Sequence, residues 1–404
     1  MKVLMDAGPW LAVPPVGYGG LENVVATLTG ELCDRGHEVV LATVGESAQP
    51  AAERVSAFAT GQFHRLAGPY PEVVGVAHAH ARLVLDTLAR HAAAGAPFDL
   101  VHTHLEVVGP AVLGALGVSA PPVVHTLHWD LARNADFYAT FDGGGRVGYV
   151  GVSASQLERG PDLLRRQALG HVPLAVPPAT APPLPRGARG AHAVLLARLT
   201  PAKGAPTAIA ACARAGVPLV LAGPVGPHPD VASLQAALAD DRAPLGADVA
   251  WFLEHVQPHL DGERVRWVGS VSGRAKAELL ATARAALFPV AWEEPGGTAV
   301  CEALTVGTPV VAMARGCLPT LVDHGRTGFL ATDLDGFTDG LRRVDEVDPA
   351  DCAAVARERF APAVMAAAYE AVYRRVLGRA PEQTRPLTLP GPRTPRSGRA
   401  AAAR

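Results

Sequence analysis

The chain has 404 residues, 49% of them hydrophobic and 18% charged, and carries a formal net charge of −2. This length predicts two domains, and the apolar content excludes a largely disordered chain. The small net charge gives no global attraction to nucleic acid, so no nucleic-acid partner is expected. The richness in Ala, Pro, Gly and Arg resembles the coding bias of a GC-rich genome and favours a bacterial origin.

The cysteines and the first residues bear on the compartment. Five cysteines are scattered without a C-x-x-C pair, which argues against a disulfide framework or a structural zinc site. The first residues enter a strand-like run without a signal-peptide pattern, and no apolar run approaches the ~20 residues of a membrane span. The sequence therefore predicts a cytoplasmic protein, and it leaves peripheral membrane contact through the first domain open.

In the first half of the chain, apolar strand-like runs alternate with helical segments, which indicates an α/β fold with parallel sheets. A helix is expected over residues 21–35, with Gly36 at the position of a C-cap glycine. Residues 45–71 are interpreted as an irregular loop. The expected strands are 3–7, 37–44, 100–104, 123–127 and 148–152.

A proline-rich segment over residues 173–190 predicts an extended linker between a domain at 1–172 and a domain at 191–362. Two units of similar size predict a cleft between them, which is a favoured ligand position. An amphipathic helix is expected over 363–377, and the Pro- and Arg-rich tail at 379–404 is expected to be disordered. The strands expected in the second unit are 193–197, 218–222, 265–268, 285–290 and 309–312.

The stretch Glu294-Pro-Gly-Gly-Thr-Ala-Val-Cys-Glu302 is the most informative motif. One carboxylate stands just before a predicted helix and the other about one turn inside it, at the carboxyl edge of a parallel sheet. Phosphate suits the glycine-rich helix N-terminus at Gly297 and Thr298, and sugar or ribose hydroxyls suit the carboxylates. A solvated loop acid and an exposed helix acid are the alternative. The position between two buried strands favours a site, since a carboxylate there needs a partner.

Consecutive glycines at Gly19 and Gly20 precede the first predicted helix, in the run Gly-Tyr-Gly-Gly-Leu-Glu. A dinucleotide fingerprint would require glycine where Glu22 stands, which weakens a dehydrogenase interpretation. Such glycines let a phosphate approach backbone N–H groups closely, and a tight strand-to-helix turn is an equal alternative.

Arg198 and Lys203 follow the first strand of the second domain, in the run Ala-Arg-Leu-Thr-Pro-Ala-Lys-Gly. Arginine can bind two oxygens at once and lysine adds a mobile point charge, so the pair suits a diphosphate. In a transferase these charges would stabilise the departing nucleotide diphosphate. Two solvated surface cations are the alternative.

Four histidines gather in the first domain, at positions 102, 104, 125 and 128. His128 is expected at the edge of the cleft, because its strand runs outward. His102 and His125 are interpreted as core histidines, and the role of His104 stays open. No Cys or carboxylate stands beside them at a zinc-like spacing, and no metal site is expected.

In their order and spacing these motifs resemble the retaining glycosyltransferases of family 4, over nearly the whole chain except the tail. The resemblance implies the GT-B fold, with two Rossmann-like domains facing across a cleft and the helix at 363–377 crossing back to the first domain. It also implies an enzyme that moves a hexose from a nucleotide diphosphate sugar to an acceptor hydroxyl. No cofactor is implied beyond that co-substrate.

The resemblance assigns roles to particular residues. Glu302 would hold ribose hydroxyls, Glu294 would hold hexose hydroxyls, and His128 would contact the sugar near the reacting carbon. The expected catalytic residues are His128, Arg198, Lys203 and Glu294. The expected donor-binding residues are Gly19, Gly20, Arg198, Lys203, Glu294, Gly297, Thr298 and Glu302. The base and sugar of the donor, the acceptor (glycan, lipid or small molecule) and the oligomeric state stay open.

Three positions depart from the family pattern. The usual hinge element is replaced by a proline-containing run from His171, the usual Phe after the first Glu-Pro is Gly296, and the usual Glu of a later Pro-Glu step is Thr320. Two alternatives therefore stay open. One is a nucleotide-sugar epimerase on the same fold, and the other is a degenerate, non-catalytic sugar-nucleotide-binding protein.

Overall fold

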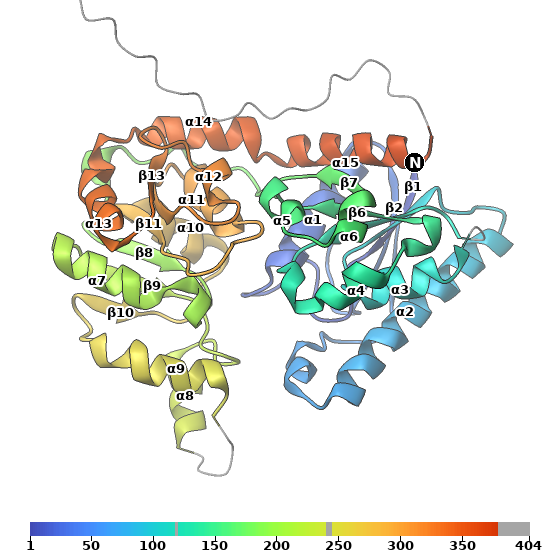
Figure 1. Ribbon diagram of the computed structural model, residues 1–404, viewed down its shortest axis with the longest axis horizontal. Helices are drawn as coiled ribbons and strands as arrows, with labels where there is room; N and C mark the ends of the chain where they lie inside the picture. The colour runs from blue at the N-terminus through green and yellow to red at the C-terminus, as the bar shows by residue number, and fades with distance from the viewer. Residues whose placement is uncertain (118–119, 240–244, 379–404) are drawn as a thin grey trace, which may run out of the picture.

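The computed structural model describes residues 1–117, 120–239 and 245–378, and places them in two lobes that lie side by side (Figure 1). Each lobe is built around its own parallel sheet, which confirms the expected α/β class. The tail expected to be disordered lies outside the described residues. Among the described helices, none combines the length and apolarity that crossing a membrane requires.

The first sheet has the strand order β3-β2-β1-β4-β5-β6-β7, and every pair in it is parallel. Its inner strands are almost entirely buried and mostly apolar, as burial on both faces favours, and the buried polar exceptions include His102, Thr103, His125 and Thr126. The strands are β1 (Lys2–Asp6), β2 (Glu38–Thr43), β3 (Glu53–Ser56), β4 (Leu100–Thr103), β5 (Val123–Leu127), β6 (Val147–Gly151) and β7 (Ala168–His171).

Strand β3 corrects the expectation of an irregular loop over residues 45–71. Its four residues are alternately half-buried and exposed, and they pair with β2 at the edge of the sheet. The rest of that region includes a 3-10 turn at Phe63–Ala67 and the start of a long helix at Tyr70. A short edge strand with polar residues gives little periodic signal, so the sequence did not reveal it.

Helices cover both faces of the first sheet. One face packs against α1 and the last helix, α15, and the other face packs against α2, α3, α4 and α6. Helix α15 places Tyr369 and Tyr373 fully inside this core, so the C-terminal helix is part of the first lobe. The helices are α1 (Gly20–Asp34), α2 (Tyr70–Ala93), α3 (Val108–Gly114), α4 (Ala135–Thr140), α5 (Ala154–Glu158), α6 (Asp162–Arg166) and α15 (Pro362–Val376).

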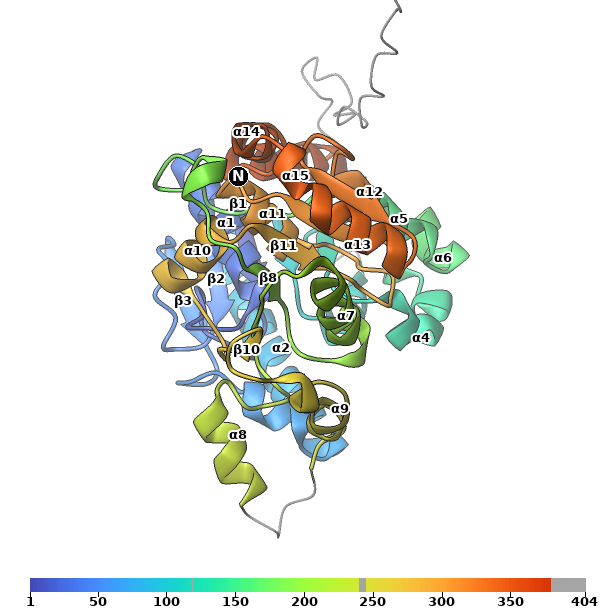
Figure 2. The ribbon, with the colours of Figure 1, turned by 90° about the vertical axis from the view of Figure 1, so that its left-hand side faces the viewer.

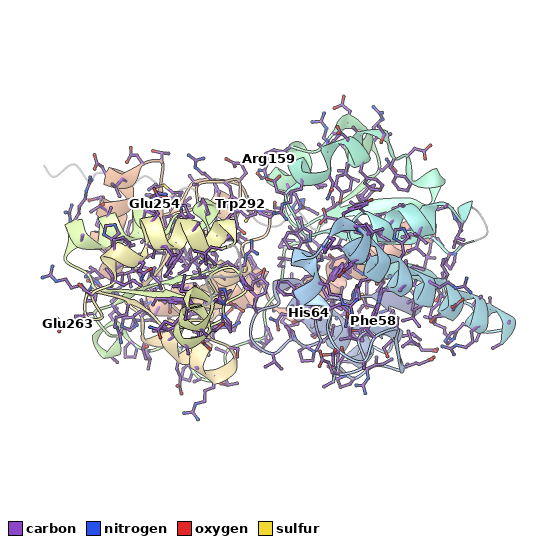
Figure 3. All side chains as sticks on the ribbon, turned by 90° about the horizontal axis from the view of Figure 1, so that it is seen from below. Phe58, His64, Arg159, Glu254, Glu263 and Trp292 are labelled. Atoms are coloured by element: carbon purple, nitrogen blue, oxygen red, sulfur yellow. The ribbon has the colours of Figure 1, made fainter. Side chains whose placement is uncertain are left out.

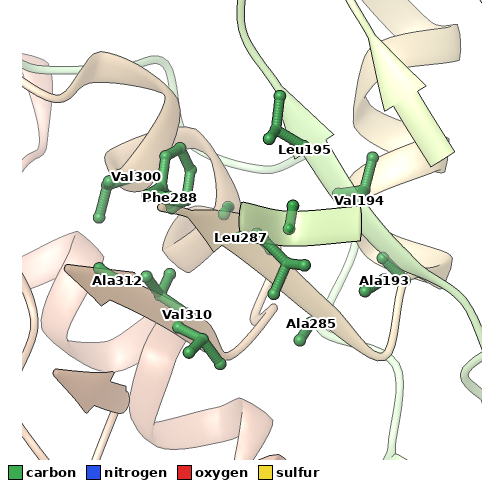
Figure 4. Close-up of a cluster of buried hydrophobic side chains, with 14 of the residues drawn as sticks. Ala193, Val194, Leu195, Ala285, Leu287, Phe288, Val300, Val310 and Ala312 are labelled. Atoms are coloured by element: carbon green, nitrogen blue, oxygen red, sulfur yellow. The ribbon is translucent and has the colours of Figure 1, made fainter. Parts of the chain in front are cut away.

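The second sheet has the order β10-β9-β8-β11-β12-β13 and is also parallel throughout. Side chains from β8, β11 and β12, among them Val194, Leu287 and Val310, pack together in its core (Figure 4). The strands are β8 (Ala193–Leu196), β9 (Leu219–Ala222), β10 (Val265–Trp267), β11 (Ala285–Phe288), β12 (Val310–Met313) and β13 (Gly328–Ala331).

The helices of the second lobe lead back to the first. Helices α14 and α15 run along one side of both lobes (Figure 1), and α8 and α9 lie at the opposite end of the second lobe (Figure 2). The linker is tied to the junction of α14 and α15, since the Val176 amide donates to the Phe360 carbonyl at 3.1 Å. The helices are α7 (Ala205–Ala215), α8 (Val231–Leu238), α9 (Ala247–His255), α10 (Gly273–Thr282), α11 (Thr298–Thr305), α12 (Leu318–Leu321), α13 (Leu334–Arg343) and α14 (Pro349–Arg359).

Both sheets reverse their strand order at one point, between β1 and β4 in the first and between β8 and β11 in the second. In open α/β sheets, ligands bind beyond the carboxyl ends of the strands at such a reversal. The segments that follow these four strands contain Gly19, His104, Arg198 and Glu294 respectively. The topology therefore places the motif residues of each lobe at its preferred ligand position.

Candidate active site

Lys203 and Glu294 form an ion pair at the reversal point of the second sheet. The Nζ of Lys203 lies 2.5 Å from Oε2 of Glu294, and the indole N–H of Trp292 donates to the same oxygen at 2.9 Å. The ammonium also lies 4.8 Å from the centre of the Trp292 ring. The structure thus brings two predicted site residues together and adds Trp292, which the sequence reasoning missed although it stands two positions before Glu294.

The glycine after Lys203 allows the lysine to come close to Glu294. Gly204 has φ 72°, and a Cβ at this position would lie 1.9 Å from the carbonyl oxygen of Pro289. Any side chain would therefore push the start of α7 away from the end of β11. Because Lys203 precedes this glycine directly, the close packing holds its side chain beside Glu294.

Glu302, the second motif glutamate, has a lysine partner of its own. It lies in the second turn of α11, and Nζ of Lys276 on α10 lies 2.6 Å from its Oε1. The chain has only three lysines, and two of them pair with the two motif glutamates. The sequence reasoning missed Lys276, whose only signal was the scarcity of lysine.

The N-terminus of α11 offers free backbone donors. Gly297 caps the helix in the left-handed conformation, with φ 63°, and its carbonyl accepts the first helical bond, from Val300 at 2.9 Å. The N–H groups of Thr298 and Ala299 have no partner among the described residues. Free N–H groups at the positive end of the helix dipole favour an anion.

Arg198 follows β8 and is half-buried, and no described residue forms an ion pair or hydrogen bond with its guanidinium. Burial raises the pKa of the Tyr18 phenol, and the charges of Arg198, Glu22 and Glu294 also act on it. Tyr18 belongs to the glycine loop, the segment around Gly19 and Gly20 in the first lobe, so this loop lies within electrostatic reach of Arg198 and Glu294 in the second.

The glycine loop itself is tightly built. Gly19 caps α1 with φ 155°, and a Cβ there would lie 2.5 Å from Cβ of Pro15, whereas nothing crowds Gly20. Glu22 in the first turn of α1 is only 5% exposed, and burial raises its pKa to about 7. The loop thus combines an open backbone at Gly20 with a carboxyl group that titrates near neutral pH.

His128 lies at the carboxyl edge of the first sheet and contacts His104. Its Nε2 is 2.7 Å from Nδ1 of His104, and burial lowers the pKa of His128 to about 3. Among the described residues, it has no hydrogen bond to the second lobe. His102 and His125 are fully buried, as expected of core histidines, and bond to Tyr373, Thr126 and the Thr103 carbonyl.

Glu106, just beyond β4, is a polar group that the sequence reasoning missed. Its Oε1 accepts from Nδ2 of Asn134 and from the hydroxyl of Tyr138, each at 3.2 Å, and burial raises its pKa to about 7. The next residue, Val107, has φ 59°, a strained value for a β-branched residue. The edge of the first sheet therefore carries a second carboxyl group that titrates near neutral pH.

The two lobes touch beside the motif. Arg159 of the first lobe lies 3.6 Å from the carboxylate of Glu293, and it lies near Trp292 at the junction (Figure 3). A Cβ on Gly296 would lie 2.7 Å from Leu174 and 3.2 Å from Val152. This packing leaves no room for the larger residue that the family pattern predicts at position 296, so the departure has a local physical reason.

Thr320, another departure, lies in a polar cluster around Arg359. The guanidinium of Arg359 donates to the Thr320 carbonyl and, at 3.0 Å, to Oδ1 of Asp323. In the part of the chain that the structure describes, no group of three or more His, Cys, Asp or Glu is arranged to hold a metal ion. All five cysteines are free, and four of them are buried.

Two family models match the chain, one on each lobe. The Glycosyltransferase Family 4 model matches residues 18–172, and the Glycosyl transferases group 1 model matches residues 188–346. These ranges contain the glycine loop and His128 in the first lobe, and both motif glutamates in the second. The chain belongs to the group 1 glycosyltransferases.

Solved structures similar to this glycosyltransferase cover nearly its whole length. AviGT4, a glycosyltransferase involved in avilamycin A biosynthesis, is 24% identical with a TM-score of 0.63, over 94% of this chain and 98% of that one. Sucrose-phosphate synthase from Thermosynechococcus elongatus is 19% identical with a TM-score of 0.69, over 93% and 99%. HepE from Anabaena in complex with UDP and glucose is 16% identical with a TM-score of 0.60, over 93% and 100%. These likenesses show the fold, which is GT-B as expected.

A curated relative matches only part of the glycosyltransferase. D-inositol 3-phosphate glycosyltransferase from a Nocardioides species is 42% identical over 89 residues, which is 22% of this chain. The match spans 19% of that relative's length. It supports the family assignment.

Proposed function

We propose that this protein is a retaining glycosyltransferase that moves a hexose from a nucleotide diphosphate sugar to an acceptor hydroxyl. The observation that carries the proposal is the set of groups at the reversal point of the second sheet. Two lysine–glutamate pairs, the guanidinium of Arg198 and the free N–H groups of α11 lie at the carboxyl ends of its strands. Cations and N–H groups suit a diphosphate, and carboxylates suit sugar hydroxyls.

The diphosphate binds between Arg198, Lys203 and the N-terminus of α11. A phosphate that binds there replaces part of the attraction between Lys203 and Glu294. The three groups together neutralise the charge that develops on the leaving nucleotide diphosphate. Gly20, whose Cα faces open space, lets the first lobe approach the same phosphates.

The two glutamates bind hydroxyls, because each uses only one carboxylate oxygen on its protein partners. Lys203 and Trp292 bond to Oε2 of Glu294, and Lys276 bonds to Oε1 of Glu302. The other oxygen of each has no partner among the described residues and can accept from a hydroxyl. Glu294 takes hydroxyls of the hexose and Glu302 takes those of the ribose.

The anomeric configuration is retained because the acceptor attacks the anomeric carbon on the same face that the leaving group departs from. The acceptor oxygen forms its bond to the anomeric carbon as the bond from that carbon to the phosphate oxygen breaks. The bonding electrons go to the phosphate, which also takes the proton of the acceptor hydroxyl. Both motif glutamates are committed to binding, so the two-carboxylate scheme of glycosidases does not apply to them.

The comparisons support a nucleotide sugar as the donor. HepE, a structural neighbour, is described in complexes with UDP and with UDP-glucose. The site of this protein offers the groups that such a ligand needs, namely cations for a diphosphate and carboxylates for hydroxyls.

Calorimetric titration with UDP, GDP, ADP and dTDP tests the proposal. We expect one of them to bind tightly and Glu302→Ala to weaken it at least about tenfold, the scale of a hydrogen bond to a charged group. Glu278→Ala is the matched control, since Glu278 is an exposed glutamate on α10 that pairs only with Arg274. Absence of binding to all four nucleotides would contradict the proposal, whereas tight binding without any transfer or donor hydrolysis would favour the degenerate binding protein.

The nucleotide that binds then defines the sugar donors to screen. Proton NMR of the product made from a nucleotide sugar would show whether the anomeric configuration is kept. An inverted product would overturn the retaining assignment, and a changed sugar released without any acceptor would favour an epimerase.

A further inference from the structure

We propose that His104 is a positioning residue that holds His128 in the Nε2–H tautomer, so that Nδ1 of His128 accepts a hydrogen bond from a hydroxyl of the bound sugar. The tautomer follows from the contacts within the first lobe alone. The sugar hydroxyl rests on the proposed function.

The strand order sets the neighbours of His104. Strand β4 lies between β1 and β5, and Met5 on β1 is paired with His102 on β4. Side chains two residues apart in a strand share a face, so His104, just beyond β4, extends the row that His102 begins. His128 lies just beyond β5, the other neighbour. His104 is therefore bounded by Met5 on one side and His128 on the other.

The proton positions follow from the chemistry of these neighbours. Nε2 of His104 lies 3.3 Å from Sδ of Met5, and a thioether sulfur can only accept. Nε2 of His104 therefore carries the proton, and Nδ1 has a lone pair. Nδ1 lies 2.7 Å from Nε2 of His128, so His128 must be the donor in this bond. Nδ1 of His128 is then left as an acceptor.

Protonation does not disturb this assignment. Burial lowers the pKa of His104 well below the ordinary value and that of His128 to about 3. A charged His102 or His125 would also repel a proton on His104, and a charged His125 would repel one on His128. Both rings are neutral near pH 7, and a neutral imidazole has one donor and one acceptor. Each proton therefore has one defined place.

The ring of His104 is held by more than its hydrogen bonds. It packs against the ring of His102 with centroids 4.3 Å apart, and His102 is bonded to Tyr373 of α15 at 2.7 Å. Thr126 joins the same network, with 2.7 Å to His102 and 2.8 Å to the Tyr369 hydroxyl. The last helix thus fixes the row of rings that orients His128.

The free nitrogen of His128 is open to a ligand. His128 is half-buried, Nδ1 has no partner among the described residues, and it is not among the buried atoms that lack one. An acceptor there requires a hydroxyl on the sugar. A nucleotide sugar that lacks that hydroxyl, or has fluorine in its place, leaves Nδ1 of His128 unpaired and should react more slowly.

Long-range ¹H–¹⁵N NMR spectra of the histidine-labelled full-length protein test the tautomer directly. We expect His128 to show a protonated Nε2 and an unprotonated Nδ1. His104→Leu should move both nitrogens toward averaged shifts, and His104→Gln should restore them because its amide oxygen can accept from Nε2–H. His91→Gln is the control, because His91 lies on α2 and pairs with Glu53 outside this row of rings.

Met5→Leu gives a second route if His104→Leu fails to fold. It keeps both histidines and removes only the sulfur acceptor, so both rings should become averaged. A protonated Nδ1 in the unaltered protein, or shifts of His128 that neither substitution changes, would overturn the proposal.

Donor hydrolysis gives the functional readout. His104→Leu should lower kcat for the nucleotide sugar about tenfold, the scale of one hydrogen bond, and leave nucleotide diphosphate affinity unchanged. His104→Gln should recover most of the loss. If the NMR result holds but no nucleotide binds, the proposed function fails and the tautomer assignment stands. If nucleotide binds and kcat is unchanged by His104→Leu, the positioning role is wrong.

Discussion

The ammonium of Lys203 lies 2.5 Å from a carboxylate oxygen of Glu294, although the two residues are 91 positions apart in the chain. The turn at Gly204 and the end of β11 create this contact. It puts a cation for phosphate next to a carboxylate for sugar hydroxyls. A nucleotide sugar contains both a phosphate and a sugar, so it can be held on either side of its reacting bond. A transfer enzyme requires such positioning.

Lys203→Ala should weaken binding of the selected nucleoside diphosphate by about tenfold to a hundredfold, since a charge-assisted hydrogen bond is lost. Binding of the corresponding nucleoside, which has no phosphate, should be unaffected. Calorimetry with both ligands measures the difference. Lys2→Ala is the matched control, because Lys2 pairs with Glu38 in the first lobe. Equal losses for nucleoside and diphosphate would contradict the assignment.

Arg198→Ala should lower turnover well over tenfold, by analogy with removal of other groups that stabilise charge in the transition state. Arg198→Lys should recover part of the loss, because it restores the charge and not the two-pronged geometry. Initial rates with a nucleotide sugar measure both. Arg274→Ala, on the exposed face of α10, serves as control. Near-normal turnover in Arg198→Ala would remove this residue from the mechanism.

Gly296→Phe should disturb the contact between the lobes. A Cβ at this position would lie 2.7 Å from Leu174, so a phenyl ring there forces neighbouring side chains to move. Overpacking of this kind lowers the free energy of unfolding by about 1–3 kcal/mol. We expect a lower midpoint of denaturation, and partial recovery in the double variant Gly296→Phe/Leu174→Ala. Gly187→Phe is a suitable control, since nothing lies within 4 Å of its Cβ position. Additive effects of the two substitutions would show that they do not interact.

Glu370 on α15 should make stability depend on acid pH. Hydrogen bonds from Arg35 and His37 lower its pKa from 4.5 to about 2. Its contribution is present above pH 4.5 and is lost as the pH falls toward 2, with a magnitude of about 2–3 kcal/mol. Glu370→Gln should therefore be less stable than the unaltered protein at pH 7, and the gap should narrow near pH 2. Denaturant titrations at both pH values measure this gap. Glu31→Gln is the control, because the Glu31 carboxylate lies 4.0 Å from Arg35 and forms no hydrogen bond with it.

Glu22 should act in the opposite sense. Burial raises its pKa from 4.5 to about 7, so the folded state keeps a proton that the unfolded chain releases. Stability from the protonated form is full below pH 4.5 and declines as the pH rises through 7. Glu22→Gln should be more stable than the unaltered protein at pH 8, by about 2–3 kcal/mol, and equal to it near pH 4. A stability gap that does not change with pH would contradict this titration.

The strands that bear the site could be predicted because they are short, mostly apolar runs. Strand β5 occupies the residues expected, and β8 and β11 begin where expected and end one or two residues early. The edge strand β3 could not be predicted, because four residues with alternating exposure give no signal against the background of loops. Lys276 was missed for a different reason. Nothing in the sequence near position 276 refers to Glu302, 26 positions away.

The sequence by itself determined the two parallel α/β units and the order in which Gly19, Arg198, Glu294 and His128 follow their strands. It could do so because a strand buried on both faces must be apolar, and because side chains after parallel strands gather at one edge. Only the tertiary structure decided which of those side chains meet. Lys203 pairs with Glu294, and His104 with His128, because strand order and register set distances that local sequence does not encode.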